Sequence, residues 1–521
     1  MRGNLKYCLI LVVGLLSVKG GFSQSNKGEI KKKSELAEAE LASLDYLKAF
    51  NSYSKLIKLD STNSTYIYKA GLCLFNLDKT DTSCLNYFFK TQDKIPESHF
   101  YIGRVYQLNG QTRKALEEFY YFKTVNDHSI IKADEVSKYI KICETALQQE
   151  LQKGTYVVKN AGKDINTNYP EYVPLVWSLD ESMFFTSRRP GSTGGLKDVY
   201  GRYFEDIYIT KKTGRGLSAP VSLSDSINTF THDACVAFSP SGNELIIYRT
   251  NEKQTGGDLY ITKYDGLNWS APEKLGREIN SGYLEASACF SADGNEIVFS
   301  SNRPGGYGGK DLYKIVKFMN GKYSLPFNLG PHINSLEDED APFIDKNDNT
   351  LYFSSKGHNT MGEYDIFKAV QNPESSNWTK IENMGMPVNS TNDDIYFVKH
   401  GDNGQAFFAS RRVGGYGDAD IYEVNFNEST QLIIYGNINT NKIEDKTILN
   451  DLRLSVYDSE TGVLEGVYRP NKNYMTFILV ALKNKPYRIL VEGKSIDPVI
   501  RYVNFSDTDK EISIEVNKRL K

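Results

Sequence analysis

Five acidic side chains recur at one place in a repeated phrase of this chain, and their carboxylates are the groups with the clearest chemical potential. Each acid stands five residues after an asparagine. Two carboxylates in unlike surroundings can cleave a glycosidic bond. Recurrence in every repeat favours a structural role instead, because catalysis needs an acid and a base at distinct places, and buried acids accept hydrogen bonds locally. These acids are Glu171, Asp233, Glu285, Glu339 and Asp394.

Arginines form the second recurring set. Three occupy matching positions and two more directly precede members of that trio: Arg189, Arg303 and Arg412, then Arg188 and Arg411. One interpretation pairs each arginine with the closing Asp of its own repeat, for example Arg303 with Asp311. The other is a one-sided basic patch on the loops, suited to a carboxylate or an acidic partner, with Tyr307 and Tyr416 as exposed contacts.

Other chemistries find no support in the sequence. The glycine loops Gly305–Gly309 and Gly414–Gly417 lack the Lys-Ser/Thr ending of a phosphate loop, so we expect tight turns there. The six histidines have no metal-ligand spacing, and no Gly-x-Ser-x-Gly nucleophile motif occurs. The sequence therefore predicts no cofactor, no metal and no catalytic residue, and we expect that the protein is not an enzyme.

The acids and arginines belong to a unit written five times between residues 165 and 425. Each unit ends on an Asp-apolar-aromatic triplet, and the triplets begin 52 to 55 residues apart, at Asp206, Asp258, Asp311, Asp365 and Asp420. A fixed period of this length with strand-like alternation inside it predicts a β-propeller with one blade per repeat. We expect five blades over 155–428. In the first unit Asp198 also begins such a triplet, which leaves the start of that strand open.

Different patterns flank the repeats. Residues 29–150 carry apolar residues at helical spacing, and small residues at Ala37, Gly71 and Gly103 recur after 34 and 32 positions, which resembles a tetratricopeptide (TPR) solenoid. Residues 430–521 contain short strands separated by turns and are similar to the carboxypeptidase regulatory-like β-sandwich. The predicted fold class is thus multidomain, with an α part followed by all-β parts.

The first 23 residues read as a cleaved signal peptide, with a positive start, a short apolar run and small residues before the cleavage point. The formal net charge of −3 argues against a nucleic-acid-binding protein. Five cysteines follow the signal. Cys73 and Cys84 flank a turn and either form a disulfide or stay buried thiols.

The order of these parts resembles periplasmic proteins of Bacteroidota that accompany type IX secretion and gliding, in which the propeller repeats are TolB-like. In that family an OmpA-like domain that grips peptidoglycan often follows; none follows 430–521, so peptidoglycan binding is not expected. The resemblance implies a periplasmic, non-enzymatic scaffold near the outer membrane, without a membrane span of its own. It would bind secretion or gliding components through several surfaces at once.

Two alternatives remain beside the scaffold. A propeller glycosidase would show an open axial pocket with carboxylates in unequal surroundings and a perturbed pKa. A carbohydrate or peptide sensor would use the arginine and tyrosine loops.

Overall fold

The computed structural model describes most of the chain after the predicted signal segment. The described residues are 28–125, 130–152, 154, 156–198, 200–213, 216–347, 349–372, 378, 380–401, 404–429, 431–440, 443, 451–471, 474–483, 485–506 and 509–519. The chain divides into two compact units, Met1–Gly154 with Val158–Val424 and Thr155–Val157 with Asn425–Lys521. The helices and the repeats therefore belong to one unit, and the C-terminal strands to the other.

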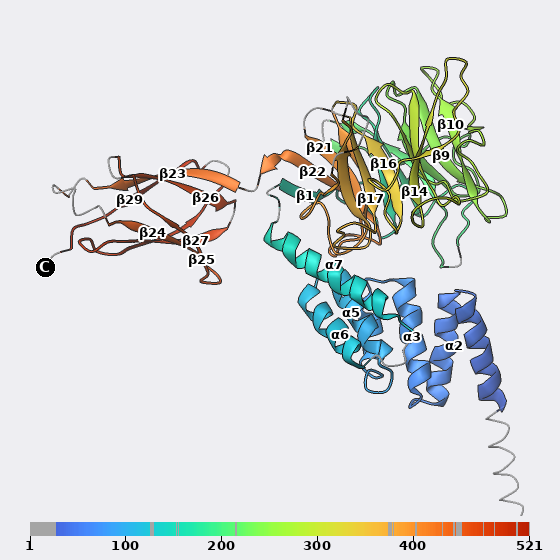
Figure 1. Ribbon diagram of the computed structural model, residues 1–521, viewed down its shortest axis with the longest axis horizontal. Coiled ribbons are helices and arrows are strands. Elements are labelled where there is room, and N and C mark those ends of the chain that lie inside the picture. Colours follow the sequence, from blue (N-terminus) through green and yellow to red (C-terminus); the bar gives the residue numbers. More distant parts are fainter. Residues whose placement is uncertain are drawn as a thin grey trace, which may run out of the picture. The chain divides into compact units, whose positions relative to one another are not determined.

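The N-terminal part is helical (Figure 1). Residues 28–42 are helical, and the further helices are α2 (Tyr46–Leu59), α3 (Ser64–Leu77), η1 (Thr82–Cys84), α4 (Leu85–Phe88), α5 (Glu97–Leu108), α6 (Thr112–Val125) and α7 (Ala133–Leu151). Asp45 caps α2 by accepting from the backbone N–H of Lys48, and Asn63 caps α3 by accepting from that of Tyr66.

Two of the small residues in the helical pattern permit close helix packing. A Cβ placed on Gly103 would lie 2.7 Å from the Phe119 ring, and one on Gly71 would lie 3.0 Å from the Phe88 ring. Glycine therefore lets α5 approach α6, and α3 approach α4, more closely than any larger residue would.

The repeats form five four-stranded antiparallel sheets in the described chain. They are β2 (Glu171–Val176), β3 (Met183–Ser187), β4 (Asp206–Thr210) and β7 (Val221–Ser222); β8 (Asp233–Phe238), β9 (Glu244–Thr250), β10 (Gly257–Lys263) and β11 (Glu273–Lys274); β12 (Ala288–Phe290), β13 (Glu296–Ser301), β14 (Asp311–Val316) and β15 (Phe327–Asn328); β16 (Glu339–Ile344), β17 (Thr350–Ser355), β18 (Asp365–Val370) and β19 (Glu382–Asn383); and β20 (Asp394–His400), β21 (Gln405–Ser410), β22 (Asp420–Ser429) and β1 (Tyr156–Asn160). A two-stranded hairpin, β5 (Lys212–Thr213) with β6 (Gly216–Leu217), stands beside the first sheet.

The five sheets close into a ring. The first strand of each sheet packs against the first strand of the next, and β20 of the fifth sheet packs against β2 of the first. A closed ring of antiparallel sheets is the arrangement of a β-propeller. The ring is joined through the fifth sheet, where β1 from the start of the repeats pairs with β22 from their end.

The asparagine of the repeated phrase links neighbouring sheets. Asn280 accepts from the backbone N–H of Leu259 at 2.8 Å and donates to its carbonyl at 2.9 Å, so the chain entering the third sheet is fixed to the third strand of the second. In the first sheet the third strand begins at Asp206, whereas Asp198 lies in the preceding loop. The strand start that the sequence left open is therefore at Asp206.

The C-terminal unit consists of two sheets around one hydrophobic core. One sheet joins β26 (Thr476–Leu482), β23 (Gln431–Asn439) and β29 (Glu511–Glu515); the other joins β25 (Leu464–Tyr468), β24 (Arg453–Asp458), β27 (Pro486–Glu492) and β28 (Val499–Asn504). Ile434 and Leu479 from the first sheet and Leu454 and Ile489 from the second are among the fully buried core residues.

Two further features concern the thiols and the helices. Cys73 and Cys84 are free and buried, and burial raises the pKa of each thiol to about 12. No helix within the described residues combines the length and apolarity needed to cross a membrane.

Candidate functional site

The five repeated acids lie at or near the starts of the first strands and are buried. Each accepts from the backbone N–H and the hydroxyl of a Ser or Thr four residues earlier. Glu285, for example, accepts from Ser281 N at 2.9 Å and from Ser281 Oγ at 2.7 Å. Each acid therefore fixes the turn that precedes the first strand of its sheet. This is true of all five: Glu171, Asp233, Glu285, Glu339 and Asp394.

Three of the sequence-predicted arginines act with these acids inside their own sheets. Arg303 Nη2 donates to the Ile279 carbonyl at 2.7 Å and lies 3.3 Å from Glu285 Oε1. Arg189 and Arg412 make the equivalent contacts with Glu171 and Asp394. The acid that each arginine meets is thus the one in the first strand, and not the acid of the closing triplet.

In the two sheets that lack this arginine, another residue supplies the contact. In the second sheet Arg249 stands directly opposite Asp233 in the β8–β9 register, and its Nε pairs with that carboxylate at 2.5 Å. In the fourth sheet His358 Nε2 donates to the Ile333 carbonyl at 3.0 Å and lies 3.9 Å from Glu339 Oε1. His358 adopts a φ of +54°, which directs the chain differently after β17.

Among the described residues, none places a permanent cation beside the acid of the fourth sheet. Burial raises the pKa of Glu339 to about 7, against the hydrogen bonds from Ser335 and Ser355 that favour the carboxylate. Burial also lowers the pKa of His358. Near neutral pH this sheet therefore pairs a largely uncharged imidazole with a carboxyl group close to its titration midpoint.

The acids of the closing triplets anchor the preceding loops or pair with a lysine. Asp311 accepts from the backbone N–H of Tyr307 at 2.6 Å and of Gly308 at 3.0 Å. The equivalent contacts are Asp206 with Thr193, Asp365 with Met361 and Asp420 with Tyr416, whereas Asp258 pairs with Lys274. The rings of Tyr307 and Tyr416 are about half exposed, at 48% and 53%.

A cavity of about 300 Å³ opens at the end of the ring where the first strands begin. We call it the axial cavity. Its charged and aromatic side chains come from the first, fourth and fifth sheets and their adjoining loops: Tyr172, Arg188, Arg202, Glu205, Tyr364, Asp393, Tyr396 and Arg411. Arg188 and Arg411 are the two predicted site residues that the structure brings here.

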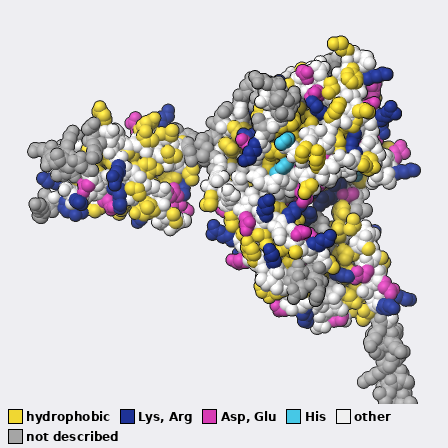
Figure 2. All heavy atoms as spheres, viewed as in Figure 1, with side chains coloured by type: hydrophobic (Ala, Val, Ile, Leu, Met, Phe, Trp, Pro, Cys, Tyr) yellow, Lys and Arg dark blue, Asp and Glu magenta, His cyan; other side chains and the backbone are white. Residues whose placement is uncertain are grey.

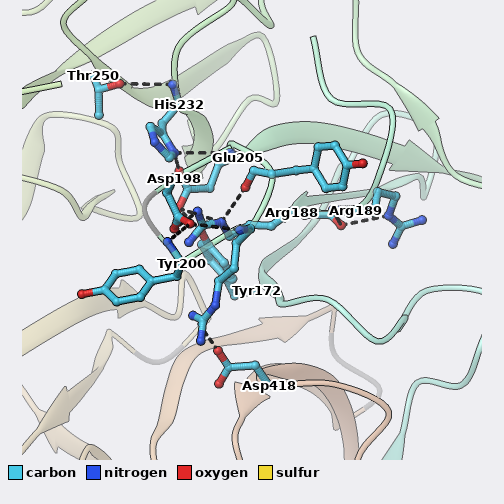
Figure 3. Close-up of polar contacts among 12 residues, drawn as sticks. Tyr172, Arg188, Arg189, Asp198, Tyr200, Glu205, His232, Thr250 and Asp418 are labelled. Atoms are coloured by element: carbon cyan, nitrogen blue, oxygen red, sulfur yellow. Dashed lines mark hydrogen bonds and ion pairs between the residues drawn. The ribbon is translucent and has the colours of Figure 1, made fainter. Parts of the chain in front are cut away.

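Glu205 lies in a network of donors on the first-sheet side of the axial cavity (Figure 3). It accepts from the Tyr172 hydroxyl at 2.7 Å and pairs with His232 Nδ1. Arg188 Nε is 3.9 Å from Glu205, while its Nη2 donates to Asp198 at 2.7 Å. This carboxylate is therefore surrounded by donors and a cation.

Asp393 has different surroundings on the fifth-sheet side. Burial raises its pKa, although the Arg411 guanidinium opposes that shift. It accepts from the backbone N–H of Tyr364 at 3.2 Å, and Arg411 Nε lies 3.7 Å from its carboxylate. One cavity thus holds two carboxylates, Glu205 and Asp393, in unequal environments.

A pair of tyrosines adds an aromatic surface. The rings of Tyr172 and Tyr396 stack with centroids 5.9 Å apart and an interplanar angle of 21°. Tyr396 has a φ of +60° and lies where the β20–β21 register shifts between Ile395 and Val398. The first and fourth sheets have the same kind of shift, with positive φ at Val173 and Ala341, so the bulge belongs to the repeat. The tyrosine side chain at this position is what is particular to the fifth sheet.

The sequence does carry a signal for the cavity residues that the repeat analysis missed. Glu205 and Asp393 directly precede the repeated acids Asp206 and Asp394. Each of the two stands directly before a strand that begins with a buried acid, and each lines the axial cavity. These neighbouring positions differ between repeats, and that asymmetry marks a site.

No group of three or more His, Cys, Asp or Glu residues in the described chain is placed to hold a metal ion. No protein-family model and no curated protein sequence matches the chain. Among solved structures, a glycoside hydrolase is 11% identical over 54% of this chain and 94% of its own, with a TM-score of 0.37.

Two further solved structures are similar at the same level. An α-L-arabinofuranosidase from Lactobacillus brevis is 12% identical over 52% of this chain and 95% of its own, with a TM-score of 0.30. A putative TolB from Agrobacterium tumefaciens is 14% identical over 53% of this chain and 98% of its own, with a TM-score of 0.27.

The recurrence of glycoside hydrolases among these structures contradicts the prediction that the protein is not an enzyme. That prediction is wrong as stated and is withdrawn. At 11% to 14% identity, the likeness to these structures concerns the fold alone.

Proposed function

We propose that the axial cavity binds a sugar and that Glu205 and Asp393 cleave its glycosidic bond. The observation that carries the proposal is the presence of two carboxylates in one cavity in unequal surroundings. Glu205 accepts from the Tyr172 hydroxyl and pairs with His232, whereas burial raises the pKa of Asp393 even with Arg411 3.7 Å away. Such an imbalance assigns an acid and a base among chemically similar groups.

In the proposed reaction Asp393 donates its proton to the leaving glycosidic oxygen, because burial favours its protonated form. Glu205 stays close to the donors Tyr172 and Arg188 and stabilises the positive charge that develops at the anomeric carbon. The C–O bond breaks, water supplies the new hydroxyl, and the water's second proton restores Asp393. The Tyr172–Tyr396 pair offers a flat apolar face for the sugar ring.

The test is hydrolysis of a panel of 4-nitrophenyl glycosides, followed by variants with the most active one. We expect Asp393→Asn to lower kcat about 100- to 10,000-fold while the sugar is still bound. Asp258→Asn is the matched control, because Asp258 pairs with Lys274 and does not line the cavity. Absence of both binding and cleavage across the panel, or wild-type turnover by Asp393→Asn, would overturn the proposal.

We further propose the finer architecture that the repeats suggest. Each four-stranded sheet is taken as one blade of a five-bladed propeller. The helices are taken as TPR-type pairs, supported by the close approaches at Gly71 and Gly103.

A second candidate function is the periplasmic scaffold that the sequence suggests, here proposed alongside and not instead of the enzyme. One observation favours it: an outward-facing apolar surface on the β23–β26 pair, where Ile433 stands opposite Val480 and Tyr435 opposite Ile478. These four side chains are 47% to 59% exposed. Hydrophobic side chains gather on the visible face of the C-terminal unit (Figure 2). Exposed apolar patches of this kind mark interaction sites.

In the scaffold proposal the partner is an outer-membrane component of a secretion or gliding assembly. Crosslinking in the native envelope, read by mass spectrometry, would test it. We expect crosslinks to such components in the wild type and their loss in Tyr435→Asp. Identical crosslinks in both proteins would count against this surface.

A further inference from the structure

A second cavity of about 200 Å³ adjoins the axial cavity. We call it the roof cavity. The two cavities share Arg202, Asp393 and Arg411 as lining residues. The remaining wall of the roof cavity includes 76–80, the end of α3 and the turn that follows it. The proposed catalytic acid therefore faces one cavity built by the ring alone and another built jointly by ring and helices.

The helical wall is firmly attached to the ring. The Arg104 guanidinium is buried, pairs with Glu363 before β18, and lies over the Tyr139 ring at 3.7 Å. Burial alone would raise the pKa of Glu363, but Arg104 outweighs it and the pKa falls to about 2. In addition, Asn392 Nδ2 donates to the Leu108 carbonyl at 2.6 Å. The helices therefore meet the ring through specific buried contacts.

The turn that lines the roof cavity is itself held in place. Asp78 accepts from the backbone N–H of Thr80 at 2.9 Å, and Asn109 Nδ2 donates to the Thr80 carbonyl at 3.2 Å. From the ring, Arg202 Nη2 donates to the Leu77 carbonyl at 3.3 Å. The turn is thus a preorganised wall, which is what a binding site needs.

Lys79 is the exposed cation of this wall. Lys79 forms no hydrogen bond or ion pair with another described residue. Its charge nevertheless helps to keep the pKa of Glu363 low. The ammonium group of Lys79 therefore lies close enough to act electrostatically on the cavity wall. Arg202 and Arg411 at the shared wall are partly exposed, at 31% and 39% of their side-chain surface. Both arginines already form an ion pair with Asp418, whose carboxylate lies 2.9 Å from Arg202 and 3.2 Å from Arg411. Four carboxylates line the same cavity. Asp393 and Asp418 lie beside these arginines, Glu363 pairs with Arg104, and Asp78 bonds to Thr80. Lys79 is therefore the cation most available to a ligand.

We infer that the substrate is an acidic oligosaccharide of at least two sugar units, read on one side by the helices. This inference rests on the proposed function. One unit occupies the axial cavity, the cleaved bond lies at Asp393, and the next unit enters the roof cavity, where Lys79 binds its carboxylate. The axial cavity alone lies at the lower limit of about 300–1,000 Å³ that is usual for small-molecule sites, and the two cavities joined lie within that range.

The experiment measures binding of mono-, di- and trisaccharides from two named series, oligogalacturonides as the acidic probe and xylo-oligosaccharides as the neutral probe, by calorimetry. We expect affinity to rise from one unit to two in the acidic series. Lys79→Ala should weaken binding of the acidic disaccharide about tenfold, as for loss of one charge-assisted hydrogen bond, and leave the monosaccharide unchanged.

Lys58→Ala is the matched control, because Lys58 is an exposed lysine in the last turn of α2 and lines neither cavity. Both lysines are exposed, so neither variant threatens folding. Asn76→Ala provides a second probe of the same wall.

The outcomes separate this inference from the proposed function. Cleavage of a 4-nitrophenyl glycoside that depends on Asp393, with no gain from a second acidic unit or no effect of Lys79→Ala, overturns the inference and leaves the function standing. A neutral series that binds as well as the acidic one also overturns it. Failure of both saccharide series to bind, together with no binding or cleavage of any 4-nitrophenyl glycoside, overturns both.

Discussion

The third and fourth sheets of the ring each bury a glutamate that fixes a turn, but they surround it with different side chains. In the third sheet the buried Glu285 meets Arg303, a cation at every accessible pH. In the fourth sheet the equivalent Glu339 meets only His358, with 3.9 Å between the closest atoms. Both acids hold the same kind of Ser turn. The shared turn shows that the acid's architectural task does not require an ion pair.

Local sterics explain why the fourth sheet differs. Gly357 occupies the place of Arg303, and a Cβ there would lie 2.0 Å from Ser335 Oγ. A side chain at this position is therefore excluded unless the turn moves. The next residue, His358, takes a positive φ and presents its imidazole to the Ile333 carbonyl, the contact that Arg303 makes with Ile279.

The largest expected effect comes from removing the two cations in turn. Arg303→Leu leaves Glu285 buried without its countercharge, and we expect a loss of about 3–5 kcal/mol in the free energy of unfolding. His358→Leu removes a hydrogen bond from a largely neutral ring, and we expect a loss of about 1–2 kcal/mol. Urea denaturation at pH 7 measures both. Equal losses would show that the two sheets do not differ as described.

A smaller effect should appear as pH dependence in the fourth sheet. The pKa of Glu339 is raised from 4.5 to about 7, so the folded chain keeps a proton that the unfolded chain releases. The stability from this group is full below about pH 4.5 and is lost as the pH rises through 7, about 3 kcal/mol in total. Glu339→Gln should abolish this loss, as seen by thermal unfolding between pH 4.5 and 8.

His358 works in the opposite direction and gives an internal check. Because burial lowers its pKa below 6.5, protonation of the unfolded chain lowers stability as the pH falls below that value. In Glu339→Gln the contribution of Glu339 is gone, while those of His358 and of the buried Asp365 in the same sheet remain. The difference in stability between wild type and variant should therefore change with pH by the amount assigned to Glu339 alone. A variant that keeps the wild-type slope would refute the assignment to Glu339.

The smallest expected effect is conversion of the fourth sheet to the chemistry of the third. His358→Arg places a guanidinium beside Glu339, which should lower the pKa of that acid and raise stability at pH 8 by about 1 kcal/mol. The readout is the midpoint of urea denaturation at pH 8 against that at pH 5. An Arg variant with unchanged stability at pH 8 would show that the positive φ keeps the side chain away from Glu339.

The sequence predicted the parts of this molecule that repeat. A helical part followed by all-β sheets, with a propeller-type ring, could be predicted from periodicity because every unit restates the same strands and turns. The partner of Arg303 could not be predicted, since Glu285 and Asp311 are both within reach along the chain and only strand register brings Glu285 close. The role of Arg249 was not predicted, because Arg249 lies two residues before Asn251, the position that matches Arg303 in the repeat. It contacts Asp233 from the directly opposite position in the neighbouring strand.

The axial cavity was harder to predict for the opposite reason. Arg188 and Arg411 drew attention because they stand beside repeated arginines, but Glu205, Asp393 and Tyr396 occupy positions that vary between repeats. Comparison of repeats highlights what is common to them, whereas this cavity is built from what differs. The predicted linkage to secretion or gliding stays a prediction, because it depends on partners that no fold alone can specify.

The pairing of β1 with β22 has a mechanical consequence. The chain enters the ring from the helices through β1 and leaves it toward the C-terminal unit through β22, and both strands belong to the fifth sheet. Tension between the two ends would thus be borne by the hydrogen bonds of this one strand pair, and the other four sheets would carry almost no load. If the two ends of the protein are pulled apart, the β1–β22 pair should separate first and open the ring. The ring could close again when the two strands re-pair, with the other four sheets still folded.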